Sequence, residues 1–177
     1  TLARLARNAA PDKTVYAVAR FSDPEAKASL EAHGVNTIAC DLMDPAALNA
    51  LPRAKNVIFM AGRKFGAGGN QPLTWAVNTY MPAAVAQAFS GSRIVAFSTG
   101  CVYAFSPTNG MGSDEDDPLD PPGEYAQSCI GRERMFEHFS AVNDTPGRLF
   151  RLNYAIDLRY GVLHDVAVKV RDGLPVD

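Results

Sequence analysis

Five short runs rich in apolar residues, separated by segments with helical patterning, constrain the fold of this chain more than any other feature. Runs that are apolar at almost every position are typical of strands buried on both faces of a parallel sheet. Parallel strands need crossover connections, which intervening helices supply and which are right-handed. The pattern therefore predicts an α/β fold of three layers, a doubly wound parallel sheet of Rossmann type between helices. The predicted strands are residues 14–19, 35–39, 56–61, 93–98 and 148–152.

Capping signals predict where helices begin and end between these strands. Asp23 and Asp44 are each followed by a proline, a pattern typical of an N-cap residue with Pro at the first helical position. Gly34 marks the end of the first of these helices. Further helices are predicted over residues 1–8, 72–90 and 161–171, and from Gly123 onward.

Composition and charge exclude several kinds of partner. The 177 residues are 47% hydrophobic and 20% charged, as in an ordinary globular protein, and we expect one domain over residues 1–177. A net charge of −2 gives no reason to expect a nucleic-acid or membrane partner, and no apolar run approaches the length of a membrane helix. Three widely spaced cysteines and three scattered histidines form neither a disulfide framework nor a metal site. We therefore expect a cytoplasmic protein without a metal.

Two short motifs predict where chemistry takes place. The strand at 93–98 leads into Thr99, and Tyr125 stands in the first turn of a helix that follows an acidic, proline-rich loop. Open parallel sheets bind their ligands at the carboxyl ends of the strands. We therefore expect the Thr99 hydroxyl and the Tyr125 phenol to converge there and to share a proton with a substrate hydroxyl or carbonyl. The two motifs read FSTGCVY at residues 97–103 and YAQSCIGRE at residues 125–133.

These motifs resemble those of the extended short-chain dehydrogenase/reductases, the NAD-dependent epimerase/dehydratase family. The family pattern is a Ser or Thr four residues before the Tyr of a Val-Tyr pair, followed later by Tyr-x-x-x-Lys. Thr99 and Tyr125 match it, whereas Cys129 stands where the family has Lys. The resemblance implies an NAD(P)-dependent oxidoreductase or epimerase that acts on a sugar nucleotide or a related hydroxyl- or carbonyl-bearing substrate. The alternative, favoured by Cys129, is a dinucleotide-binding protein that has lost catalysis and acts as a sensor or interaction module.

The resemblance assigns catalytic roles to the two matching residues. Tyr125 is expected to act as acid or base toward the substrate oxygen. Thr99 either hydrogen-bonds that oxygen or ties down the end of its strand. A free phenol titrates near pH 10, and the family Lys lowers that value, which a neutral Cys129 thiol does not do. Arg132, seven residues after Tyr125 and on the same helix face, either delivers the missing positive charge or is a surface residue paired with a nearby glutamate.

Neighbouring positions bear on the reaction and the substrate. Family dehydratases carry an Asp-Glu pair where this chain has Gly100 and Cys101, so the resemblance argues against dehydration. Tyr103 is expected to be structural. Asn153 and Tyr154 fall where the family has an Asn that contacts the substrate.

Cofactor contacts are expected at the ends of two further strands. Asp41 and Leu42 resemble a family pair that contacts the adenine, and a turn role for Asp41 is the alternative. Arg20 follows the strand at 14–19, where NAD-preferring members place an acidic residue for the ribose diol. An arginine there favours a 2′-phosphate. The expected cofactor is therefore NADP, with NAD as the second choice, and the alternative for Arg20 is a solvated side chain.

Small and polar residues complete the expected cofactor site. Ala61 and Gly62 match a small pair at which the family backbone passes close to the cofactor, and small size is the physical requirement. Asn78 matches an Asn that supports the family's active site; it either does so here or bonds a local carbonyl. Ser98, next to Thr99, is expected to contact the cofactor.

Two parts of the family pattern have no counterpart in this sequence. A dinucleotide site needs a Gly-rich turn between the first strand and a helix, and the glycines of residues 66–69 follow a later strand and lack that spacing. The resemblance therefore implies that the first strand and the phosphate loop lie upstream of residue 1. It also implies that the substrate-binding region lies largely beyond residue 172, and that the helices carrying Trp75 and Tyr125 pair in a homodimer. Residues 1–177 alone are expected to bind the cofactor poorly.

Overall fold

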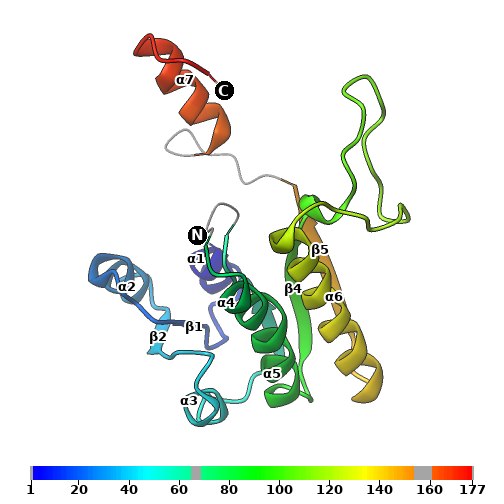
Figure 1. Ribbon diagram of the computed structural model, residues 1–177. Coiled ribbons are helices and arrows are strands. Elements are labelled where there is room, and N and C mark those ends of the chain that lie inside the picture. Colours follow the sequence, from blue (N-terminus) through cyan, green and yellow to red (C-terminus); the bar gives the residue numbers. More distant parts are fainter. Residues whose placement is uncertain (1, 65–68, 154–160, 177) are drawn as a thin grey trace.

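Parallel strands form the centre of the structure, a computed structural model that describes residues 2–64, 69–153 and 161–176 (Figure 1). Each predicted strand is present, and every pairing between strands is parallel among the described residues, which confirms the α/β fold. The strands are β1 (Tyr16–Ala19), β2 (Asn36–Ala39), β3 (Asn56–Phe59), β4 (Arg93–Thr99) and β5 (Gly147–Leu152).

Hydrogen bonding divides these strands into a pair, β1–β2, and a triplet in the order β3–β4–β5. In the doubly wound fold the strands lie in the order 3-2-1-4-5-6. The strands β1 and β2 correspond to strands 2 and 3 of that order, and β3, β4 and β5 correspond to strands 4, 5 and 6. Strand 1 of that order lies between the counterparts of β1 and β3, which do not pair with each other among the described residues. The described residues therefore form two parts of the predicted sheet rather than one continuous sheet, because none of them occupies the position between the parts.

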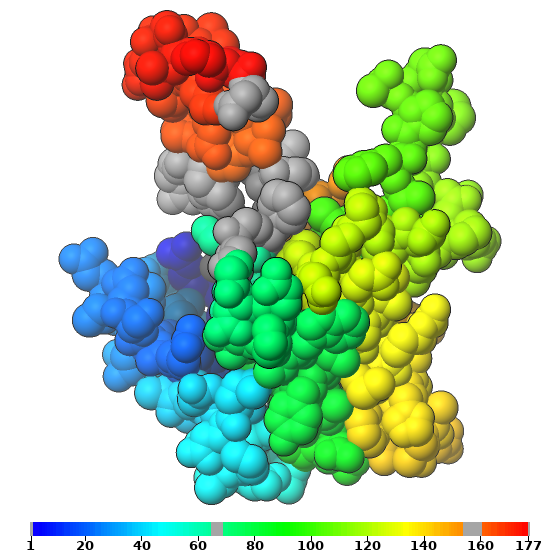
Figure 2. Space-filling model, in the orientation of Figure 1, coloured from blue at the N-terminus to red at the C-terminus, as the bar shows by residue number. Residues whose placement is uncertain are grey.

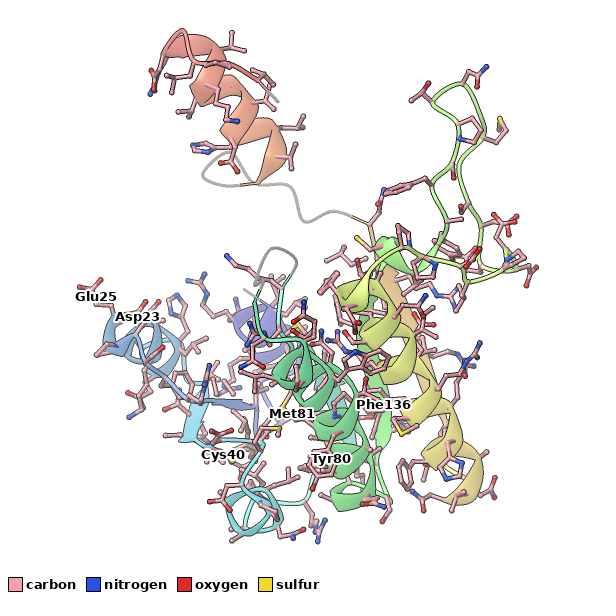
Figure 3. All side chains as sticks on the ribbon, viewed as in Figure 1. Asp23, Glu25, Cys40, Tyr80, Met81 and Phe136 are labelled. Atoms are coloured by element: carbon pink, nitrogen blue, oxygen red, sulfur yellow. The ribbon has the colours of Figure 1, made fainter. Side chains whose placement is uncertain are left out.

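Helices connect the strands and begin where the capping signals predict. The Asp23 carboxylate accepts hydrogen bonds from the N–H groups of Glu25 and Ala26, and Asp44 caps the next helix in the same way (Figure 3). In the part of the chain that the structure describes, no helix is both long and apolar enough to cross a membrane. The helices are α1 (Leu2–Ala9), α2 (Pro24–Glu31), α3 (Pro45–Asn49), α4 (Gln71–Trp75), α5 (Met81–Ala88), α6 (Glu124–Val142) and α7 (Val162–Arg171).

The predicted long helix over residues 72–90 is interrupted by a π-helical turn, Ala76–Tyr80, between α4 and α5. Pro82 supplies the physical reason, since a proline lacks an N–H and its ring presses on the carbonyl four residues earlier, at position 78. The side chain of Asn78 lies within this turn and is completely buried. The predicted helix is therefore present, and its π-helical turn falls at a residue that the resemblance places in the active site.

The core lies between the β3–β4–β5 sheet and the helices α5 and α6, which lie side by side in Figure 1. The rings of Phe59 on the sheet and Phe136 on α6 meet there with their centroids 5.1 Å apart. Phe136 is labelled in Figure 3. The close approach of the helices depends on Gly131, where a Cβ would lie 2.5 Å from the Thr79 hydroxyl oxygen. This packing holds the amino end of α6, which carries Tyr125, beside the end of β4.

Residues 104–123 form a loop ahead of α6 that projects from the body of the molecule (Figure 2). Phe105 and Met111 are exposed there. In the acidic stretch the Asp114 carboxylate accepts the N–H of Asp116, and the Asp117 carboxylate accepts the N–H of Asp114, each at 3.0 Å. These carboxylates therefore stabilise turns within a solvated loop.

Candidate functional site

Thr99 and Tyr125 lie together at the carboxyl end of β4. Thr99 is the last residue of that strand, and Tyr125 stands in the first turn of α6. The Thr99 hydroxyl lies close enough to the Tyr125 phenol to lower its pKa. The Thr99 hydroxyl also accepts the N–H of Cys101 at 3.1 Å, so it anchors the turn after β4 as well as facing the phenol. The structure thus brings the two predicted catalytic residues into contact, and their roles in catalysis stay a prediction.

Burial raises the pKa of the Tyr125 phenol to about 12. The nearby Cys129 thiol adds to this increase in pKa, whereas the Thr99 hydroxyl opposes it. No lysine stands one helical turn away to lower the pKa, because residue 129 is a cysteine. At neutral pH Tyr125 is therefore a protonated phenol, well suited to giving a proton to an oxygen and poorly suited to accepting one.

Cys129 is completely buried, one helical turn after Tyr125. Burial raises the pKa of its thiol, and the charge of Arg132 opposes that increase. A buried thiol with a raised pKa stays protonated and unreactive at neutral pH. Cys129 therefore brings no positive charge to Tyr125.

Arg132 is also buried, so the alternative of a surface arginine paired with a nearby glutamate is wrong. Its guanidinium donates to the carbonyl of Phe97 at 3.0 Å and to the side-chain oxygen of Asn78 at 2.9 Å. The two nearby glutamates are paired with other arginines, Arg151 and Arg134. A positive charge consequently lies inside the molecule, between α6 and the ends of β3 and β4.

Asn78 connects the loop after β3 with the helix that carries Tyr125. Its side-chain oxygen accepts the N–H of Arg63 at 2.8 Å, and its amide donates to the Arg63 carbonyl at 3.4 Å and to the Ser128 hydroxyl at 3.0 Å. Ser128 in turn donates to the carbonyl of Tyr125 at 2.7 Å. Asn78 therefore bonds distant segments rather than a carbonyl of its own helix, and it supports the framework of the site.

Arg20, Asp41 and Leu42 follow β1 and β2. Arg20 is exposed, and no described residue pairs with it. Phe21 beside it has a φ of 48°, a left-handed conformation that is uncommon outside glycine and concentrates at functional sites. Asp41 accepts the N–H of Met43 at 3.0 Å, which is the turn role named as its alternative, and Leu42 packs against the core. Arg20 is thus accessible to an anionic ligand, whereas Asp41 stabilises a turn.

Ala61, Gly62 and Ser98 lie at the ends of β3 and β4. Ala61 packs against the core. A Cβ at Gly62 would collide with the Arg132 guanidinium and lie 3.0 Å from the Asn78 side-chain oxygen, so the small size of residue 62 is required by the chain's own side chains. The Ser98 hydroxyl is buried and has no partner among the described residues. An orphaned polar atom at the end of a strand is suited to a ligand.

Asn153, at the end of β5, lies beside the turn that follows β4. A Cβ at Gly100 would lie 2.8 Å from the Asn153 side-chain oxygen and 3.2 Å from its Cα. An aspartate at position 100 would therefore collide with Asn153 in the conformation that Asn153 has here. Tyr154 and the glycines at 66 and 68 are outside the described residues.

Glu133 and Arg151 form a buried ion pair that sequence reasoning did not find. Glu133 is completely buried, and its carboxylate lies 2.9 Å from the Arg151 guanidinium. Arg151 also donates to the Tyr103 hydroxyl at 2.7 Å and to the Glu115 carbonyl at 3.2 Å. The pair therefore joins α6, β5 and the acidic loop. The available signal was Arg151 itself, because a charged residue in a predicted buried strand needs a partner.

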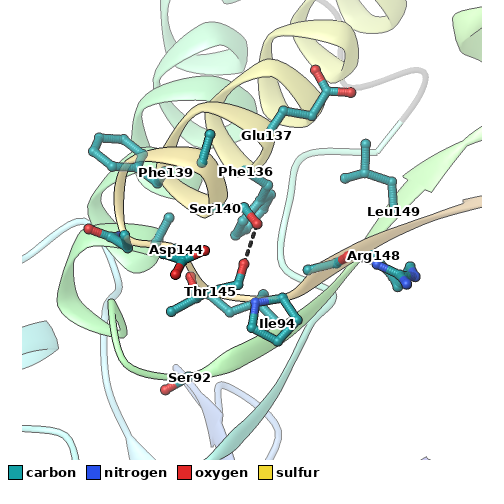
Figure 4. Close-up of a pocket in the computed structure, with 15 residues that line it drawn as sticks. Ser92, Ile94, Phe136, Glu137, Phe139, Ser140, Asp144, Thr145, Arg148 and Leu149 are labelled. Atoms are coloured by element: carbon teal, nitrogen blue, oxygen red, sulfur yellow. Dashed lines mark hydrogen bonds between the residues drawn. The ribbon is translucent and has the colours of Figure 1, made fainter.

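The cavity in Figure 4, about 670 Å³ in volume, lies at the other end of the sheet. It is bounded by the carboxyl half of α6 and the amino ends of β4 and β5, and the Ser140 hydroxyl donates to the Thr145 carbonyl within it. The predicted site residues do not line it. The candidate site is therefore the strand-end region around Thr99 and Tyr125.

Most of the chain matches the model of a known protein family. The family model described as "NAD dependent epimerase/dehydratase family" matches residues 1–155. No curated protein sequence matches the chain.

Solved structures with the same fold include three proteins with bound nicotinamide cofactors. DesIV, a dTDP-glucose 4,6-dehydratase from Streptomyces venezuelae solved as a double mutant with NAD and DAU, is 21% identical with a TM-score of 0.77, over 98% of this chain and 59% of that one. UDP-glucuronic acid 4-epimerase from Bacillus cereus with NAD is 16% identical with a TM-score of 0.76, over 98% and 60%. RMD from Pseudomonas aeruginosa with NADPH is 20% identical with a TM-score of 0.68, over 93% and 64%. The chain spans less than two thirds of the length of each, and at these identities the likeness shows the fold.

Proposed function

This chain belongs to the NAD dependent epimerase/dehydratase family, and we propose that it is an NADP-dependent oxidoreductase or epimerase of a sugar nucleotide or a related hydroxyl- or carbonyl-bearing molecule. The observation that carries the proposal is the proximity of the Thr99 and Tyr125 hydroxyl groups at the carboxyl end of a parallel strand. Two of the similar structures are named for nucleotide sugars, which supports that substrate class. When bound, the nicotinamide supplies or accepts the hydride.

Tyr125 and Thr99 have different roles at the substrate oxygen. Thr99 holds that oxygen through its hydroxyl, and Tyr125 gives it a proton as the carbonyl becomes an alcohol. The raised pKa of Tyr125 keeps the phenol in the protonated form that this direction requires. The site therefore favours reduction of a carbonyl over oxidation of an alcohol.

The strand ends fit a nicotinamide dinucleotide in part. The orphaned Ser98 hydroxyl lies next to Thr99, so we assign Ser98 to the reacting end of the cofactor. Gly62 leaves the surface open at the end of β3, and Arg20 offers an exposed cation at the end of β1 for a 2′-phosphate. Within the described ranges no Gly-rich turn provides the N–H groups that a pyrophosphate needs, so these residues account for the two ends of the cofactor and not for its middle.

The raised pKa of Tyr125 predicts how the two directions of the reaction depend on pH. Alcohol oxidation needs the ionised phenol, whose fraction increases about tenfold per pH unit below a pKa of about 12. The logarithm of kcat for oxidation should therefore rise with a slope near one, without a plateau, from neutral pH to about pH 10. Carbonyl reduction needs the protonated phenol and should show no such dependence. Initial rates measured in both directions check this, and a plateau for oxidation near pH 7 would contradict it.

Arg20 predicts the choice between the two nicotinamide cofactors. Replacing Arg20 by alanine should weaken NADPH binding about 10- to 100-fold, the loss expected for a charge-assisted contact with a phosphate. NADH lacks the 2′-phosphate, so its dissociation constant should change by less than about threefold. Fluorescence titration of the full-length protein with each cofactor measures both values. Arg4→Ala, which removes another arginine, serves as the control, and equal losses for the two cofactors would contradict the assignment.

The proposed function itself is tested with the full-length protein and a panel of substrates. The protein is titrated with NADPH and assayed with UDP- and dTDP-linked hexoses and their 4-keto derivatives. We expect NADPH binding and its consumption with at least one 4-keto sugar nucleotide. Tight NADPH binding without turnover of any member would instead support the second candidate function, a dinucleotide-binding sensor, which the uncharged Cys129 favours. Failure to bind either cofactor would contradict both.

A further inference from the structure

Arg132 is a buried cation that no carboxylate of the described residues pairs with. Glu133, the neighbouring buried charge, is paired with Arg151, whereas Arg132 bonds to the uncharged oxygens of Phe97 and Asn78. Its Nε atom is buried without a partner in the ranges the structure describes. Burying an unpaired charge is costly, so a guanidinium in this state points to a use other than stability.

The guanidinium lies where three parts of the site meet. Its bond to the Phe97 carbonyl reaches β4 two residues before Thr99. Its bond to Asn78 reaches the loop after β3, because the same Asn78 oxygen holds the Arg63 N–H. A side chain at Gly62 would occupy the place of the guanidinium, and Gly62 itself is exposed. The positive charge therefore lies directly beneath the surface at the carboxyl ends of β3 and β4.

Cys129 lies between this charge and the phenol. Residues 129 and 132 are neighbours on α6, three positions apart and both buried. The Arg132 charge acts on the Cys129 thiol, and that thiol in turn acts on the Tyr125 phenol. A row of side chains thus follows α6 and ends at Thr99, formed by Arg132, Cys129 and Tyr125.

We propose that Arg132 is the positioning cation of this active site, fixing the ends of β3 and β4 against α6 and placing a buried positive charge beside position 129. The inference rests on the proposed function. Positions 129 and 132 then form one unit that accommodates a single cation, at either position and not at both. If Arg132 had only a structural role, the expectation would differ. Cys129→Lys would then change kcat by the same factor with Arg132 present or replaced.

A double-mutant cycle in the full-length protein separates these two expectations. Cys129→Lys puts two buried cations in neighbouring positions, and Arg132→Ala removes the existing one, so each single variant should lower kcat about tenfold or more. The double variant again holds one cation, and its kcat should exceed that of either single variant by about tenfold. Arg134→Ala, which removes an exposed arginine of the same helix, is the matched control and should keep wild-type kinetics.

Thermal unfolding supplies a readout that does not need turnover. Cys129→Lys should lower the unfolding temperature with Arg132 present and recover most of that loss when Arg132→Ala is added. Additive losses in both kcat and unfolding temperature, or a faster enzyme from Cys129→Lys alone, would overturn the inference. Failure of the proposed function is distinguishable, since it appears as normal turnover in Tyr125→Phe or as no turnover in any protein. In both cases the unfolding cycle still measures the coupling between positions 129 and 132.

Discussion

Replacing Tyr125 by phenylalanine should lower kcat for a sugar-nucleotide substrate by about 100- to 10,000-fold, the range for loss of a general acid. The variant loses one oxygen, and Thr99 is left to bind the substrate oxygen without a phenol to protonate it. The buried Cys129 thiol is too enclosed to take over, because it is completely inaccessible to solvent. The ring of residue 125 is retained, so folding and NADPH binding should persist. Steady-state kinetics and a fluorescence titration with NADPH, made on the same preparation, measure the two effects separately.

Tyr103→Phe is the matched control for this variant. It also removes one phenol oxygen, which here accepts a hydrogen bond from Arg151 at 2.7 Å in the structural cluster beside the acidic loop. Its kcat should stay within about fivefold of the wild type, since this oxygen is not part of the row that ends at Thr99. Turnover by Tyr125→Phe at the wild-type rate would remove Tyr125 from the mechanism, while the fold and the family would stand.

The strands and the helix caps could be predicted because their signals are local. Asp23 and Asp44 cap helices exactly as their side-chain chemistry requires, and β4 ends one residue past its predicted boundary. The π-helical turn around Asn78 was missed although Pro82 is visible in the sequence. A proline there is compatible with a kink, a break or a π turn, and the burial of Asn78 against α6 selects among them.

The meeting of Thr99 and Tyr125 could be predicted because topology alone brings a strand end and the next helix start to one edge of a sheet. The burial of Arg132 could not be predicted. Helical periodicity puts Arg132 on the same face of α6 as Tyr125, but it does not say whether solvent or other residues cover that face at residue 132. Its burial depends on Gly62, which has no Cβ and so leaves room for the guanidinium, and on the side-chain oxygen of Asn78, which accepts a hydrogen bond from it. Only the tertiary structure brings these two residues close to Arg132.

Breaking the ion pair of Glu133 and Arg151 should lower the free energy of unfolding strongly. Glu133→Ala leaves the Arg151 guanidinium, whose side chain is 18% exposed, without its carboxylate. Removing one partner of a buried pair costs about 3–5 kcal/mol, because the other charge stays behind uncompensated. This is a large part of the free energy of unfolding of a typical domain. Urea unfolding of the variant and the wild type, followed by circular dichroism, measures the difference.

Glu137→Ala, on the same helix, separates the effect of burial from that of ion pairing as such. Glu137 pairs with Arg134 at 2.7 Å, yet both side chains are about half exposed, and water screens the pair. Its loss should therefore cost no more than about 0.5 kcal/mol. Replacing Glu133 and Arg151 together by methionine should be less harmful than Glu133→Ala, since no charge is then left buried. Equal losses for Glu133→Ala and Glu137→Ala would show that Arg151 finds solvent or another partner through the acidic loop, and that the pair does not anchor that loop to α6.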